Sequence, residues 1–205
     1  MEKVRNLFGG GRSYTMSDRE PMAPSDNELM EAVRDGRIEQ LAVLFERHQV
    51  VLYNFFLRLT GNRSASEDLV QDVFTRILKY RAGYLGRDRF VVWMFQIARN
   101  AHVDHLRKRK DELPLGESFA EPPSREPRPE EALEEEREAA LMHRALGRLP
   151  WKKREVLMLS RYESLKLREI AELMGCEVGT IKAQVHRALQ DLGRIYLELR
   201  DGRTT

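Results

Sequence analysis

The chain has little of what membrane, secreted and disulfide-stabilised proteins contain. Its 205 residues include one cysteine, Cys176, which excludes an internal disulfide and a zinc site built from several cysteines. No apolar run approaches the ~20 residues that cross a bilayer, and the first residues lack the apolar stretch of a secretory signal. These absences predict a cytoplasmic protein in a reducing compartment.

Aromatic residues are also few, at 8%, while 33% of the residues are charged. The formal net charge of +2 hides a segregation, because residues 111–138 hold eleven acids and three bases and so carry −8. The rest of the chain therefore carries +10. Basic ends around an acidic middle favour contact with nucleic acid, although a solvated charge run has the same composition.

The order of helical and non-helical segments predicts two small domains. Residues 1–25 show no helical period and are expected to be a disordered extension. Five prolines among acidic residues predict a flexible linker over 111–132, between domains at 26–110 and 133–200 that dock only weakly on each other. No alternating strand pattern occurs, so the expected fold class is all-α.

Hydrophobic spacing and capping residues predict eight helices. Ser25 with Glu28 forms a capping box for the first helix, and Ser64 with Glu67 forms one for the third. The helices are expected to begin near residue 26 and then to span about 37–59, 64–80, 89–110, 130–148, 150–161, 167–174 and 178–199.

The last two helices have the spacing of a helix-turn-helix. A short amphipathic helix meets Gly175, which adopts a left-handed turn at low cost, and a second helix follows. The expected buried stripe of the second helix is Ile181, Val185, Ala188, Leu189 and Leu192. Its other face suits the major groove of DNA and carries Thr180, Lys182, Ala183, Gln184 and Arg187. A helical hairpin with a solvated polar face is the alternative.

Two helices of the first domain carry further candidate surfaces. Asp68, Gln71 and Asp72 lie opposite the apolar face of the third helix, and this acidic stripe suits a basic partner or is simply solvated. On the fourth helix, Phe90, Met94, Ile97 and Ala101 form a core stripe, and Phe95 is also expected in the core. A separate face, which suits stacking on unpaired bases, carries Trp93, Gln96, Asn100 and Arg107.

In this order, the motifs resemble bacterial RNA polymerase sigma factors of the extracytoplasmic-function (ECF) group. The resemblance rests on four segments and covers residues 26–110 as sigma region two and 133–199 as region four. The segments are Glu67–Phe74, Trp93–Arg107, Leu149–Val156 and Gly179–Ala188.

The resemblance implies roles that spacing alone does not show. Asp68, Gln71 and Asp72 would dock on the clamp helices of the largest polymerase subunit, and region four would meet the flap of the second-largest subunit. The loop 83–88, with Arg89, Arg99, Asn100 and their neighbours Trp93, Gln96 and Arg107, would capture flipped bases of the minus-ten element. Thr180, Lys182, Ala183, Gln184 and Arg187 would read the minus-thirty-five element as duplex.

The implied function is that of an alternative sigma factor for a stress or envelope signal, held by an anti-sigma factor. The resemblance also implies a protein that is not an enzyme and needs no cofactor or metal. The alternative is a helix-turn-helix regulator that is no polymerase subunit. A metal protein is a weaker alternative, because His102 and His105 have no third ligand at a fitting spacing.

Overall fold

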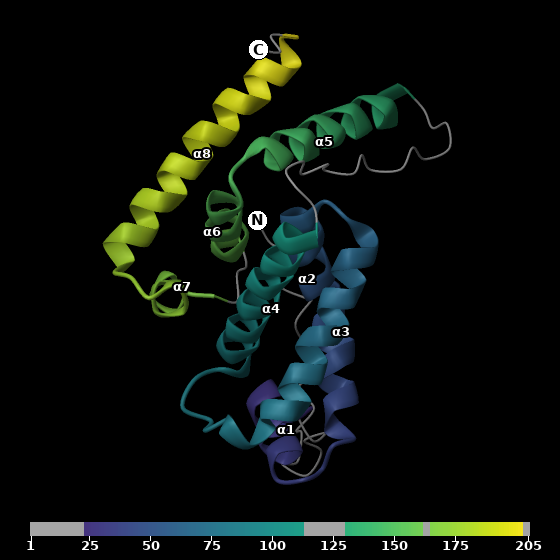
Figure 1. Cartoon of the computed structure of the whole chain (residues 1–205), viewed down its shortest axis with the longest axis vertical. Helices are drawn as coiled ribbons and strands as arrows, with labels where there is room; N and C mark the ends of the chain where they lie inside the picture. Colours follow the sequence, from purple (N-terminus) through teal and green to yellow (C-terminus); the bar gives the residue numbers. More distant parts are fainter. Residues whose placement is uncertain (1–22, 113–129, 162–164, 203–205) are drawn as a thin grey trace, which may run out of the picture.

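A computed structural model describes residues 23–112, 130–161 and 165–202, and within these ranges the chain is helical with no strand (Figure 1). Residues 1–22 of the predicted extension and 113–129 of the predicted linker lie outside the described residues, whereas the two ends of the predicted linker are helical. The N-terminal unit comprises α1 (Asp26–Arg34), α2 (Gln40–Thr60), α3 (Arg63–Tyr80), a 3-10 turn η1 (Arg81–Gly83) and α4 (Phe90–Glu112). The C-terminal unit comprises α5 (Glu130–Arg148), α6 (Trp151–Arg161), α7 (Leu167–Met174) and α8 (Val178–Arg200).

The core of the N-terminal unit is built from large rings. Phe55 is fully buried and meets Phe56 and Phe95 edge to face, with ring centroids 5.4 Å and 5.3 Å away. The stripe predicted for α4 is buried as expected, and so is Phe95. Since these residues point inward, the remaining faces of α4 are left for other contacts.

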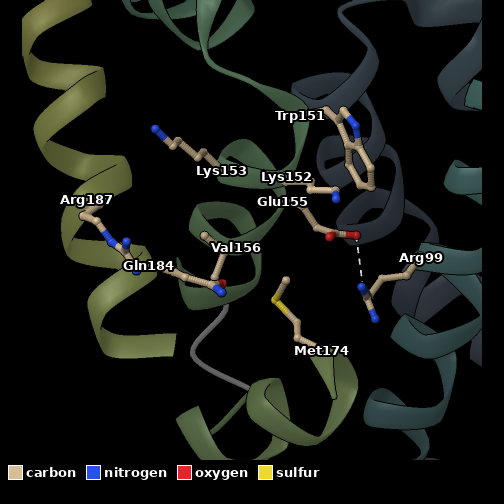
Figure 2. A pocket seen from close by; sticks show the side chains of 9 residues that line it. All are labelled: Arg99, Trp151, Lys152, Lys153, Glu155, Val156, Met174, Gln184 and Arg187. Atoms are coloured by element: carbon tan, nitrogen blue, oxygen red, sulfur yellow. Dashed lines mark hydrogen bonds and ion pairs between the residues drawn. The ribbon is translucent and has the colours of Figure 1, made fainter. Parts of the chain in front are cut away.

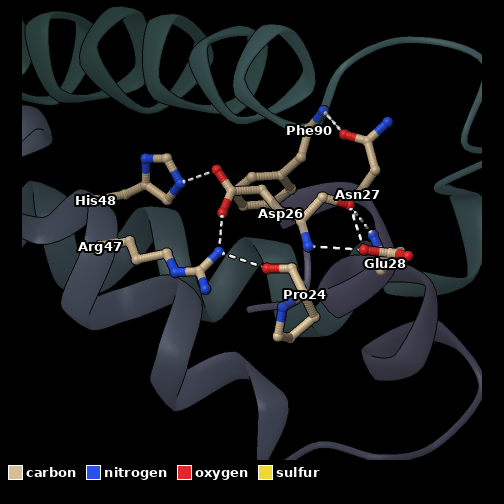
Figure 3. Close-up of polar contacts among 8 residues, drawn as sticks. Pro24, Asp26, Asn27, Glu28, Arg47, His48 and Phe90 are labelled. Carbon is tan, nitrogen blue, oxygen red and sulfur yellow. Dashed lines mark hydrogen bonds and ion pairs between the residues drawn. The ribbon is translucent and has the colours of Figure 1, made fainter. Parts of the chain in front are cut away.

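The first helix, α1, forms polar contacts with both α2 and α4. The predicted capping box is confirmed, with the Ser25 backbone N–H donating to the Glu28 carboxylate at 2.7 Å. Asp26 accepts from Arg47 at 2.8 Å and lies 2.7 Å from the His48 ring nitrogen, while Asn27 accepts the Phe90 backbone N–H at 2.8 Å (Figure 3). These contacts fix where α4 begins.

The capping box predicted at Ser64 is wrong. The helix α3 begins one residue earlier, and its N-cap is Asn62, whose side chain accepts the Ala65 backbone N–H at 3.0 Å. Gly61 ends α2 in the left-handed conformation, with φ at 65°. Because Asn caps as well as Ser, the first suitable residue after that stop takes the position.

The C-terminal unit contains the predicted helix-turn-helix. Gly175 ends α7 with φ at 64°, and the Cys176 backbone N–H donates to the Ala171 carbonyl at 3.0 Å, so α8 starts at a sharp angle. Ile181 and Ala188 are fully buried as expected. Leu189 was expected in the core but is 40% exposed, because it lies at an apolar groove on the surface.

The two units pack on each other, which differs from the weak docking that the linker composition predicted. The helix α4 lies against α7, and α2 lies against α5 and α6 (Figure 1). The fully buried Arg154 of α6 donates to the carbonyl of Leu59 at the end of α2. Linker composition could not reveal this packing, since the contacts are made by side chains of distant helices.

Candidate nucleic-acid interface and docking surfaces

The outward face of α8 presents the residues predicted for the major groove. Thr180, Lys182, Ala183 and Arg187 are exposed, and Gln184 is half-buried. The Arg187 Nε–H donates to the Ala183 carbonyl at 3.2 Å, so this guanidinium lies along its own helix. The face is therefore polar and positively charged, which suits a helix in the major groove of DNA.

Residues of both units line a cavity of about 490 Å³ between α4, α6, α7 and α8 (Figure 2). Gln184 and Arg187 reach it from α8, and Arg99 reaches it from α4. Lys152 and Lys153 add positive charge on α6, although Lys153 is paired with Asp191. A cavity of this size holds a small molecule but not a DNA duplex.

On α4, the residues predicted to contact unpaired bases differ in exposure. Trp93 is half-buried, with its ring centroid 5.2 Å from that of Tyr84 and 6.5 Å from that of Phe90. Gln96 is also half-buried, and Asn100 is exposed. The Arg107 side chain is 77% exposed, and its closest acid is Asp104 at 3.8 Å. An aromatic ring, two amides and an exposed guanidinium therefore share this helix.

The predicted loop 83–88 is held in one shape by two residues. Tyr84 is buried, its hydroxyl donates to the Asp88 carbonyl at 3.3 Å, and burial raises its pKa to about 12. Gly86 has φ at +68°, and a Cβ there would meet a Glu31 carboxylate oxygen at 2.7 Å. A side chain at this position is disfavoured by the backbone conformation, and the flexible Glu31 side chain would have to move aside. The loop is thus anchored beside the start of α4.

Two predicted strand-binding residues, Arg89 and Arg99, form ion pairs with the C-terminal unit, although the Arg89 side chain is still 46% exposed. Arg89 donates to both oxygens of Glu169, at 3.1 Å and 3.3 Å. Arg99 donates to Glu155 at 3.0 Å and to the Leu173 carbonyl. Sequence reasoning missed both glutamates, because helical spacing does not distinguish a buried acid from a surface acid.

The acidic stripe on α3 is only partly available. Asp68 and Gln71 are exposed, and Asp68 forms no ion pair within the described ranges. Asp72 is paired with Arg76 at 2.9 Å, and Arg76 also bonds Asp104 of α4 at 2.8 Å. The stripe therefore presents one uncompensated carboxylate and one neutralised carboxylate.

Two apolar grooves were not foreseen from the sequence. One, of about 380 Å³ between α5, α6 and α8, is lined by Met142, Leu146, Leu157, Met158, Leu189 and Tyr196, among others. The other, of about 330 Å³, lies beside Gln71 and is lined by Phe45, Val50, Tyr53 and Val70. Val50 is 62% exposed, which is unusual for an aliphatic side chain with neighbours of the same kind.

His102 is packed in the interior of the protein. It is fully buried, and its ring lies 5.8 Å from that of Trp151. Burial lowers its pKa to about 4, and His105 and Arg154 also act to lower it. No cluster of three potential metal ligands occurs among the described residues.

Comparison with known proteins decides the family. The family models for sigma-70 region 2 and sigma-70 region 4 match residues 44–112 and 139–192. The ECF sigma factor RpoE of Cereibacter sphaeroides is 33% identical over 168 residues, which is 80% of this chain and 91% of that protein. This chain belongs to the ECF sigma factors. The ECF sigma factor SigE of Mycolicibacterium smegmatis is 31% identical over 190 residues, covering 88% of this sigma factor and 72% of that protein.

Solved structures show the same fold as this sigma factor. CnrH, in complex with the cytosolic domain of CnrY, superimposes with a TM-score of 0.62 at 22% identity, over 88% of this chain and all of that one. The sigma factor RpoE of Bartonella quintana, in complex with the anti-sigma factor NepR, gives 0.62 at 24% identity over 75% and 94%. In the parts of this sigma factor that are described, no helix is long and apolar enough to span a bilayer.

Proposed function

We propose that this ECF sigma factor acts in the cytoplasm, as an alternative sigma factor for a stress or envelope signal. It would bind core RNA polymerase, direct it to particular promoters and help to open the DNA, and it would catalyse no reaction itself. One observation carries the proposal: the chain joins a helix-turn-helix to a second helical unit that exposes Asp68 and Gln71 beside an apolar groove. A helix-turn-helix regulator needs no such second surface.

Polymerase docking is assigned to both apolar grooves. Asp68 and Gln71, with the groove at Val50 and Tyr53, offer an apolar centre with an acidic edge to the clamp helices. Asp72 contributes less charge because Arg76 neutralises it. The groove between α5, α6 and α8 offers Met142 and Leu189 to the flap, and both are about 40% exposed.

Promoter contact is divided between the two units. The face of α8 with Thr180, Lys182, Ala183, Gln184 and Arg187 would read the minus-thirty-five element in the major groove. On α4, Trp93 and Asn100, with Gln96 and Arg107 and the loop 83–88, would hold extruded bases of the minus-ten element. Arg89 and Arg99 join them once they are free of the C-terminal unit.

An anti-sigma factor is proposed as the inhibitor. The RpoE structure of similar fold is itself a complex with an anti-sigma factor. The two apolar grooves are the surfaces where we expect the inhibitor to bind. Each exposes aliphatic or thioether side chains to water, and binding would bury them.

Run-off transcription with core polymerase and a promoter library tests the function and reveals the promoter sequence. Asp68→Arg should weaken polymerase binding by several kcal/mol through like-charge repulsion, with an unchanged melting curve. Asp72→Arg should weaken it less. Asp35→Arg is the matched control, because Asp35 is an exposed acid at the end of α1, outside the stripe. If all three variants bind core polymerase with equal affinity, the stripe on α3 is not the docking surface.

Asn100→Ala separates promoter opening from polymerase binding. Loss of the amide would leave a partner group on an extruded base unpaired, at a cost of about 1–3 kcal/mol. Permanganate reactivity of unpaired promoter thymines should fall, while polymerase affinity stays the same. If the parent chain binds duplex DNA but never binds core polymerase, the helix-turn-helix regulator is the correct function.

A further inference from the structure

The cavity of about 490 Å³ has features of a small-molecule site, which the proposed function does not require. Residues of α4, α6, α7 and α8 line it, so it is enclosed by helices of both units (Figure 2). Its volume lies within the range of about 300–1,000 Å³ that is usual for small-molecule sites. The cavity is therefore large enough for an organic ligand with several polar groups.

Positive charge predominates in the lining of this cavity. The lining residues include four cations and one acid, which are Arg99, Lys152, Lys153, Arg187 and Glu155. Glu155 is neutralised, because Arg99 donates to its carboxylate at 3.0 Å. The cations on α6 and α8 therefore line the cavity without a free acid of the lining to offset them.

Two of these cations form no ion pair within the described parts of the chain. Lys152 is exposed, and its Nζ lies 5.8 Å from the centroid of the Trp151 ring. Arg187 is also exposed, and its Nε–H donates to a carbonyl of its own helix. Lys153, by contrast, is paired with Asp191. An anion in the cavity would supply the counter-charge that Lys152 and Arg187 lack.

The position of Lys152 within α6 is unfavourable for the helix itself. Lys152 and Lys153 lie in the first turn, which contains no acid. The macrodipole makes this end of a helix positive, so cations in the first turn are repelled by it. The pairing with Asp191 accounts for Lys153. Helix stability does not account for Lys152, whereas an anion bound in the cavity would.

The rest of the lining offers an apolar wall and an amide. Val156 of α6 and Met174 of α7 line the cavity together with Trp151 (Figure 2). Gln184 of α8 is half-buried, and its amide can both donate to and accept from one edge of a ligand. A planar ring with polar edges fits this wall, and phosphates fit the cations. Nucleotides combine both parts in one small molecule.

We propose that this cavity is a nucleotide-binding site. The phosphates would lie on Lys152, Lys153 and Arg187, and the base would lie against Met174 and Gln184. Because the lining comes from both units, a bound nucleotide would raise the melting temperature of the packed chain. Nucleotide binding requires neither core polymerase nor a promoter, so its failure is distinct from a failure of the proposed function in run-off transcription.

Calorimetric titration of the full chain at constant ionic strength tests the site, with ATP, tripolyphosphate and adenosine as probes. ATP should bind at least about tenfold more tightly than either of the other two, because only ATP reaches both the cations and the apolar wall. Equal affinities for ATP and tripolyphosphate would overturn the placement of a base in the cavity. An absence of ATP binding would overturn the site as a whole.

Two double variants of equal charge separate this cavity from general attraction between cations and phosphate. Lys152→Gln/Lys153→Gln removes two cations of the lining. Lys79→Gln/Lys108→Gln removes two exposed cations elsewhere, and Lys79, like Lys152, lies over a neighbouring ring, that of Tyr80. The first double variant should bind ATP about tenfold more weakly than the second. Equal ATP affinities would overturn the proposal.

The single variant Lys152→Gln covers a failure of the first double variant to fold. Lys152 is exposed, so its replacement should leave the melting curve unchanged. Its ATP affinity should fall by a smaller factor in the same direction. An ATP affinity equal to that of Lys79→Gln would again contradict the site.

Duplex DNA is a second source of phosphate, and the same double variants distinguish it from a nucleotide. Binding of a duplex oligonucleotide of random sequence is measured for both. Equal duplex affinities, beside unequal ATP affinities, would support a site for a small ligand. If Lys152→Gln/Lys153→Gln weakens duplex binding as much as ATP binding, these lysines contact the DNA backbone and the proposal is wrong.

Discussion

In the N-terminal unit the buried polar side chains are Thr60, Ser66 and His102, whereas in the described part of the C-terminal unit they are Arg154, Glu155 and Glu169. The first three carry no charge at neutral pH, and the second three are ionisable and charged in their usual states. Each charged group bonds across to the N-terminal unit, through Leu59, Arg99 and Arg89 respectively. The C-terminal unit thus depends on its neighbour to satisfy its buried charges.

The apolar cores of the two units differ in the kind of side chain that they bury. The aromatic rings Phe55, Phe56, Phe90 and Phe95, which are fully buried, all belong to the N-terminal unit. Each such ring removes roughly 150–250 Å² from water, so a few of them stabilise a small domain strongly. The C-terminal unit buries mainly aliphatic side chains, such as Leu157, Ile170 and Ile181. The N-terminal unit should therefore contribute more of the stability.

The largest effect is expected from Phe55→Ala. Removal of this ring leaves a cavity between Phe56 and Phe95 and should lower the free energy of unfolding by about 3–5 kcal/mol. Val50→Ala, on the same helix but 62% exposed, should change it by less than about 0.5 kcal/mol. Urea denaturation measures both variants, and similar losses would refute the picture of an aromatic core.

Arg154→Ala should lower the free energy of unfolding by about 3 kcal/mol. The carbonyls of Leu59, Gly147 and Leu149 would lose their donor, and a buried side chain would be missing. Arg161→Ala, in the last turn of the same helix and exposed, is the control. Calorimetry should show an earlier, broader transition for Arg154→Ala. A single sharp transition at the parent temperature would contradict the dependence of one unit on the other.

Acid should lower the free energy of unfolding through His102. Its pKa is lowered from 6.5 to about 4. The stability that neutral His102 contributes is therefore fully present above about pH 6.5 and is lost as the pH falls towards 4. The loss attributable to His102 reaches at most about 3 kcal/mol. Urea denaturation between pH 7 and 4.5 measures it. In His102→Leu the slope should be shallower, although burial also lowers the pKa of His143, so some slope remains. Identical slopes would exclude His102 as the cause.

The smallest effect concerns the polar face of α8, where Lys182 and Arg187 are exposed. Arg187→Ala should relax base preference at one or two positions of the minus-thirty-five element, by about 1–3 kcal/mol of discrimination. Lys182→Ala should lower affinity for all sequences alike and reduce the salt slope by about one. Selection of binders from a randomised element separates the two. If the Arg187 variant selects the same sequence as the parent, Arg187 does not read bases.

Local patterns in the sequence determine most of the helices by themselves. Period and capping residues place α5 and α7 at their observed bounds, and the core stripe of α4 is buried as predicted. The turn at Gly175 also follows from residue type, because glycine adopts the left-handed conformation at little cost. These features depend on interactions between residues a few positions apart, and such interactions are encoded in the local sequence.

Only the tertiary structure decided which charged residues pair with one another. Arg89 and Arg99 were predicted as strand-binding residues, yet their guanidiniums meet Glu169 and Glu155, 80 and 56 positions away. Asp72 was predicted as an available acid, yet it is paired with Arg76. A helical period predicts which face of a helix a side chain lies on, but it does not predict which other helix packs on that face. Packing between distant helices decides which charges are removed from water and paired, and the local sequence does not encode it.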